Sequence, residues 1–122
     1  MDPSTRRFTT WADLRAHLAA AHAVTDAGDD ALQATVAGAV LEVRRVEHGG
    51  RAWIEILAML EHDLRDVPPT SVLVKNFTLA VGALGIASGS LVLRQLLPLD
   101  GLRAVDLDEV VTEAARVVAE SR

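Results

Sequence analysis

Histidine is the residue type in this sequence that most readily supports metal binding or acid–base catalysis, and the chain has four. His17 and His22 lie five residues apart on a predicted helix, about 140° apart around its axis, so they cannot hold one ion together. His48 falls in a predicted turn and His62 at the end of a predicted strand. The acidic residues on either side of His62 add one or two ligands, and no spacing elsewhere supplies the rest. We therefore expect histidines at the surface or in packing contacts, and no metal site.

The serines and glycines match no motif for nucleophilic or phosphate chemistry. The chain has no cysteine, and no serine lies in a Gly-x-Ser-x-Gly turn between a strand and a helix. Residues 48–50, His-Gly-Gly, resemble part of a lipase oxyanion loop, but two glycines between alternating strands are typical of a tight turn. Gly82 and Gly85 lack the lysine and the serine or threonine of a phosphate-binding loop. We predict no catalytic residue, no cofactor and no enzymatic activity.

Composition and charge narrow the class of protein further. The 17 acidic and 12 basic residues leave a net charge of −5, and the arginines are scattered, so nucleic acid is not an expected partner. Residues 76–93 carry no charge, but glycines and serines interrupt them, which favours two strands around a turn over a membrane span. No signal peptide is expected, and the absence of cysteine fits a cytoplasmic protein. A chain of 122 residues, 50% of them hydrophobic, predicts one globular domain, residues 1–122, with a flexible N-terminus at residues 1–9.

The first half of the chain predicts a helix and then a hairpin. Thr10 can cap a helix at residues 11–22, with Asp13 in its first turn. Residues 25–30 are polar, contain a glycine and have no periodicity, which predicts a loop. From Leu32 the sequence alternates as a half-buried strand, which the turn at residues 47–50 ends. The next strand then covers residues 51–61.

The second half predicts a short helix, a second hairpin and a last helix. Two prolines precede a helix at residues 70–78, and strands at 79–87 and 90–97 flank a turn at residues 88 and 89. Asp106 and Glu109 form a capping box for the terminal helix. The fold class is therefore α+β: an antiparallel sheet of about four to five strands, packed by N-terminal, middle and C-terminal helices.

One face of this sheet is expected to be too apolar for contact with water. If all three helices cover the other face, this one should be polar, yet the alternation gives it large apolar side chains around one arginine. Tryptophan, methionine and arginine are enriched where proteins meet, so we predict that this face binds a partner. Alternatively, a helix crosses the face and the residues are ordinary core. The predicted partner-binding residues are Trp53, Leu57, Met59, Val92, Arg94 and Leu96.

The second half also resembles the type III secretion chaperone-like superfamily, with its CesT-like and YbjN-like branches. The resemblance covers residues 72–122 and rests on Asn76 after a short helix, a glycine-containing turn at Gly89, and a Leu-Pro-Leu step at residues 97–99 before the last helix. It implies an antiparallel sheet with helices against it, a homodimer, and a non-enzymatic acidic protein. In the secretion chaperones such a protein holds an extended stretch of a client before export, and in the YbjN-like branch its role is regulatory or chaperone-like.

Two main hypotheses follow from different classes of protein. The first is a dimeric, chaperone-like module that binds an apolar segment of a partner protein on the apolar sheet face. The alternative is a small-molecule-binding or enzymatic domain, with a pocket between the first helix and the sheet and Glu61, His62 or Arg94 as polar groups. A third hypothesis is a structural subunit of a larger assembly, which would not fold stably alone.

Overall fold

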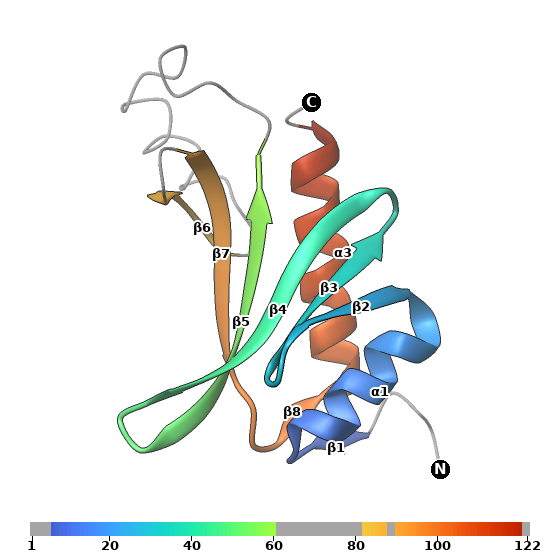
Figure 1. The fold of residues 1–122 in the computed structure, drawn as a ribbon, viewed down its shortest axis with the longest axis vertical. Coiled ribbons are helices and arrows are strands. Elements are labelled where there is room, and N and C mark those ends of the chain that lie inside the picture. The colour runs from blue at the N-terminus through green and yellow to red at the C-terminus, as the bar shows by residue number, and fades with distance from the viewer. Residues whose placement is uncertain (1–5, 61–81, 88–89, 121–122) are drawn as a thin grey trace.

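The computed structural model describes residues 6–60, 82–87 and 90–120, which form an α+β fold (Figure 1). Six antiparallel strands make one sheet in the order β2-β3-β4-β5-β7-β6, and β1 and β8 make a two-stranded sheet. The predicted middle helix at residues 70–78 lies outside the described residues. The elements are β1 (Arg7–Phe8), α1 (Trp11–Ala21), β2 (Ala23–Gly28), β3 (Ala31–Val36), β4 (Ala39–His48), β5 (Arg51–Met59), β6 (Ala83–Ala87), β7 (Ser90–Pro98), β8 (Leu102–Arg103) and α3 (Ala104–Glu120).

Helix α1 begins where its sequence predicts. Thr10 is extended, and its hydroxyl accepts a hydrogen bond from the Asp13 backbone amide at 3.2 Å, which satisfies one free donor of the first turn. The helix ends at Ala21, one residue earlier than predicted, because His22 returns to an extended backbone. Leu14 and Leu18, one turn apart, are fully buried and fix the face that α1 presents to the core.

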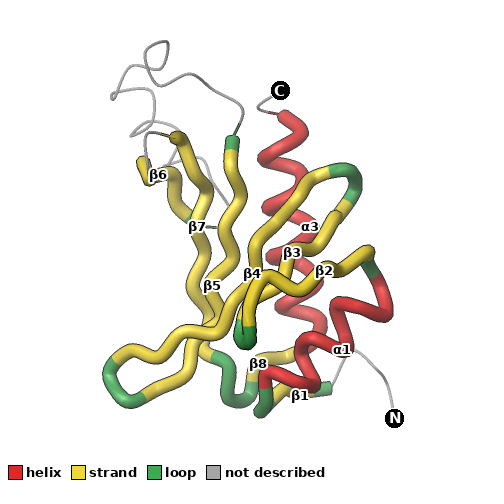
Figure 2. Tube along the Cα trace, viewed as in Figure 1, coloured by secondary structure: helices red, strands yellow, loops and turns green. Residues whose placement is uncertain are grey.

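Both predicted hairpins are present. β4 and β5 are joined by Gly49 and Gly50, whose φ angles of 62° and 73° lie in the left-handed region that glycine adopts without strain. Figure 2 shows this hairpin extending away from the helices. In the second hairpin Ala87 pairs with Ser90, so the chain reverses between β6 and β7 at the predicted position.

The sheet has more strands than predicted because two features lack a sequence pattern. Residues 25–30 were expected to be a loop, but β2 continues to Gly28 and pairs with β3. It is an edge strand with almost all its residues exposed, so no apolar alternation marks it. The single strand expected from Leu32 is two strands, β3 and β4, which reverse at Ala37 and Gly38.

Within residues 1–9, for which the sequence predicted flexibility, the structure describes residues 6–9 and finds a short strand. Arg7 and Phe8 form β1, and Phe8 pairs with Leu102 of β8. The Phe8 side chain is fully buried, and its ring meets that of His17 edge-on at 5.2 Å. Backbone hydrogen bonds from Gly101 to Phe8 and from Ala104 to Arg6 fix this segment to the start of α3.

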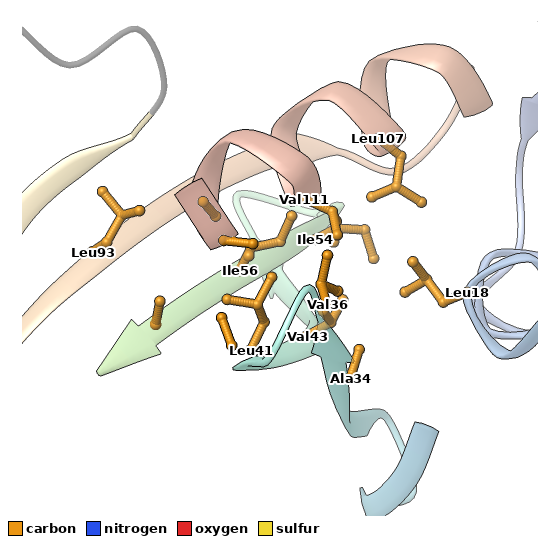
Figure 3. Packing of buried hydrophobic residues seen from close by; sticks show 14 of the residues in the cluster. Leu18, Ala34, Val36, Leu41, Val43, Ile54, Ile56, Leu93, Leu107 and Val111 are labelled. Atoms are coloured by element: carbon orange, nitrogen blue, oxygen red, sulfur yellow. The ribbon is translucent and has the colours of Figure 1, made fainter. Parts of the chain in front are cut away.

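Helix α3 begins at Ala104, two residues before the predicted capping box. Asp106 therefore lies inside the first turn, where its carboxylate accepts two hydrogen bonds from Arg103 at 2.8 Å. Figure 3 shows Leu107 and Val111 of α3 pointing at the sheet, where Ile54 and Ile56 lie. Helix α1 packs on the same side of the sheet, so both helices cover one face, and the core lies between the helices and the sheet. No helix within the described residues is long and apolar enough to cross a membrane.

Candidate functional site

The face of the sheet opposite α1 and α3, here called the open face, carries the residues that the sequence analysis singled out. Strands alternate, so the neighbours of each core residue point to this face, and neither described helix covers it. Cross-strand pairing brings Leu57 opposite Arg94, and Met59 opposite Val92. In its centre the open face consists of Val40, Glu42, Arg44 and Val46 of β4, Trp53, Glu55, Leu57 and Met59 of β5, and Val92, Arg94 and Leu96 of β7. It continues through Ala31, Gln33 and Thr35 of β3 on one side and Ala83 and Gly85 of β6 on the other.

The six predicted binding residues share this face but differ in exposure. Met59 is 55% exposed and Val40, nearby on β4, is 56% exposed, and these are large values for apolar side chains. Leu57 and Leu96 are half-buried, whereas Val92 is buried and offers little surface to a partner.

Trp53 lies at the base of the protruding β4–β5 hairpin, where it pairs with Val46 on one side and Pro98 on the other. Its indole nitrogen donates a hydrogen bond to the His48 carbonyl at 3.3 Å. The Arg51 guanidinium lies 5.2 Å from the ring centroid, within range of a cation–π contact. The ring is therefore held in place and half-exposed.

Glu55 is the one buried charged residue among the described residues, and it lies at the centre of the open face with only 4% exposure. One carboxylate oxygen accepts from Arg44 Nε at 2.6 Å, and Arg44 Nη2 lies 2.5 Å from the same oxygen. The other oxygen accepts from Arg94 Nε at 2.6 Å. Burial pushes the Glu55 pKa up, but hydrogen bonds from Arg94 and Arg44 outweigh it and hold the pKa below its ordinary value.

A partly open cavity of about 330 Å³ lies beside this cluster, lined by residues of β4, β5, β7 and the edge strand β6. Arg44, Glu55 and Arg94 form its polar side. The sequence analysis placed a pocket between the first helix and the sheet, but the cavity that Arg94 lines is on the opposite side. Glu61 and His62, the other polar groups of that hypothesis, lie outside the described residues. The rest of the lining is Leu57, Ala83, Leu84, Gly85 and Val92.

The histidines do not assemble into a site in the part of the chain that the structure describes. No group of three or more histidine, cysteine, aspartate or glutamate side chains there could hold a metal ion. His17 connects the two helices instead, with its Nε2 2.8 Å from an Asp108 carboxylate oxygen.

Sequence reasoning missed Arg44 and Glu55 as a pair, although a signal for them exists. A two-residue hairpin loop fixes its register, and the Gly49–Gly50 turn pairs His48 with Arg51. Arg44 lies four residues before His48 and Glu55 four residues after Arg51, so the two are directly opposite each other.

No protein-family model, no curated protein and no solved structure matches the chain.

Proposed function

We propose that this protein binds an apolar segment of a partner protein on its open face, in a chaperone-like or regulatory role that involves no catalysis. The observation that carries the proposal is the exposure of Met59 and Val40 on a sheet face that neither described helix covers. Large apolar side chains exposed on a sheet face favour burial against a partner, because exposing them to water is unfavourable. The sequence resemblance to secretion chaperones supports the same role and a homodimer, and the absence of cysteine favours a cytoplasmic location.

Trp53 is the best anchor for such a segment. Its contacts with the His48 carbonyl and Arg51 already restrict the ring, so binding costs little further side-chain entropy. Half-buried aromatic side chains of this kind carry much of the binding energy in protein interfaces. We expect Trp53→Ala to weaken binding by about 2 kcal/mol, or roughly thirtyfold.

Site-specific photo-crosslinking in the source cells tests the proposal. A crosslinking residue at Met59 should trap one dominant protein that the same residue at Ala119, exposed on α3, does not trap. Apolar peptides from the trapped protein should then bind the purified chain in titration calorimetry. Identical proteins trapped at both positions, or equal peptide affinity for wild type and Trp53→Ala, would contradict it.

A charge-matched pair of double variants separates the open face from the rest of the surface. Leu57→Glu with Leu96→Glu adds two charges to the face, and Ala19→Glu with Ala119→Glu adds the same charges to exposed helix positions. Only the first pair should lose peptide binding, provided that circular dichroism shows both folded. Light scattering tests the dimer, which requires twice the 13.0 kDa chain mass. A monomer at every concentration would remove the dimer from the proposal.

A further inference from the structure

The cavity on the open face has a hydrogen-bonding edge that none of the described residues uses. Arg94 is half-exposed and lines the cavity, and among the described residues it donates a hydrogen bond through Nε alone, to Glu55. The edge formed by its Nη1 and Nη2 therefore has no hydrogen-bond partner there. Two parallel N–H groups of this kind match the two oxygens of a carboxylate.

Glu55 fixes this edge before any ligand arrives. Its carboxylate is nearly fully buried and is held from both sides, by Arg44 on one oxygen and Arg94 on the other. The Arg94 guanidinium is therefore oriented by the protein, which lowers the entropic cost of binding. Glu55 is a positioning residue in this arrangement.

The shape of the Arg94 edge and the lining select the ligand. Two guanidinium groups lie against the buried Glu55 carboxylate and the Glu42 carboxylate lies 3.8 Å from Arg44, so the charges of these four side chains balance. The Nη edge of Arg94 therefore selects by geometry, because it fits the two oxygens of a single carboxylate. Leu57, Val92 and Gly85 give the cavity an apolar wall. Its volume of about 330 Å³ is at the lower end of small-molecule pockets.

We propose that this cavity binds a small organic monocarboxylate with an apolar body, its carboxylate on the Nη edge of Arg94 and its body against Leu57, Val92 and Gly85. Leu57, Val92 and Arg94 line this cavity and also belong to the open face of the proposed function, so the monocarboxylate and the partner segment overlap there. The monocarboxylate needs only the partly open cavity beside Arg94, whereas a protein segment extends across the strands.

Octanoate and octanamide are the probes, because they share the apolar body and differ in charge. In an NMR titration of the labelled chain, octanoate should shift the amide signals of Leu57, Gly85 and Val92, and bind at least tenfold more tightly than octanamide. Arg94→Gln should weaken octanoate binding about tenfold or more, and Arg103→Gln, in β8 and outside the cavity lining, should not.

A second variant blocks the apolar half without touching the charges. A Cβ atom at Gly85 would meet nothing within 4 Å, so Gly85→Val places its methyl groups in open space and suits a strand. It should also weaken octanoate binding about tenfold by filling the cavity. Because it leaves Glu55 paired, it keeps the test valid even if Arg94→Gln unfolds.

Three results would overturn the proposal: equal affinity for octanoate and octanamide, undiminished binding by folded Arg94→Gln, or undiminished binding by Gly85→Val. A leucine-rich peptide with one glutamate is a further probe. If this peptide binds and octanoate does not, and Arg94→Gln and Gly85→Val both weaken the peptide, the Nη edge of Arg94 binds a protein segment and the proposal is wrong. None of these results depends on the crosslinking at Met59, so failure here leaves the proposed function to its own test.

Discussion

Replacing Glu55 by glutamine should reduce the free energy of unfolding by about 2 kcal/mol. Removing one partner of a fully buried ion pair costs about 3–5 kcal/mol, because the remaining charge stays buried and unpaired. Here Arg44 and Arg94 are 44% and 53% exposed, so water can solvate them after the substitution. The glutamine oxygen can still accept a hydrogen bond from one arginine, but its NH₂ group faces the guanidinium of the other. The loss of stability should therefore be smaller than the roughly 3–5 kcal/mol of a fully buried pair, yet well above zero.

The pH dependence of this effect has a definite sign. The Glu55 pKa in the folded protein lies below its ordinary value of 4.5, because the two arginine hydrogen bonds outweigh burial. A carboxyl group whose pKa is lower in the folded than in the unfolded protein binds more protons when unfolded, so it stabilises the fold at pH values above its unfolded pKa. This stabilisation is lost as the pH falls from the unfolded pKa through the lower pKa of the folded protein. The difference between wild type and Glu55→Gln should therefore be largest near neutral pH and shrink in acid.

Urea unfolding followed by circular dichroism at several pH values measures both effects. Glu42→Gln is the matched control, because Glu42 lies 3.8 Å from Arg44 and both side chains are substantially exposed. Such a pair contributes about 0.5 kcal/mol or less. If Glu55→Gln costs no more than Glu42→Gln, or if its cost does not decline in acid, the buried cluster does not stabilise the fold as argued.

Two further substitutions test features that the sequence did not indicate. Phe8→Ala should cost about 3 kcal/mol in thermal or urea unfolding, because the ring is fully buried, and a loss below about 1 kcal/mol would mean that β1 adds little to the core. Ala37→Asn should stabilise the chain by about 0.5–1 kcal/mol in urea, because Ala37 has a φ angle of 50° and asparagine tolerates the left-handed region better; a loss of stability would refute this.

The elements that sequence reasoning recovered are those with local physical causes. The Thr10 cap, the Gly49–Gly50 turn and the alternation along β5 each depend on residues close together in the chain. On β5, the residues predicted for the core face, from Ala52 to Leu60, are buried or half-buried. Local patterns therefore predicted the α+β class, the two hairpins and which residues of β5 face the core.

The elements that it missed have no such cause in their own sequence. β2 is held by backbone pairing with β3 and by an ion pair between Asp26 and Arg15 of α1 at 2.6 Å. Neither contact requires apolar alternation in β2 itself. The β3–β4 turn uses alanine at a position where asparagine, aspartate or glycine is the usual signal, so the chain appears continuous there. In both cases tertiary pairing overrides a weak local preference.

In the candidate site, too, one contact follows from local sequence and another depends on long-range pairing. The β4–β5 turn fixes the pairing of Arg44 with Glu55, so the first half of the cluster is a local property of the sequence. The alternation of β7 places Arg94 on the open face, because Leu93 is buried in the core, but it does not fix the register against β5. Strand registers that differ by two residues keep every side chain on the same face. Only the actual register, with Arg94 opposite Leu57, sets the diagonal hydrogen bond to the second oxygen of Glu55. The contact that makes burial of this carboxylate favourable is therefore long-range, and it is also the contact that orients the Nη edge of Arg94.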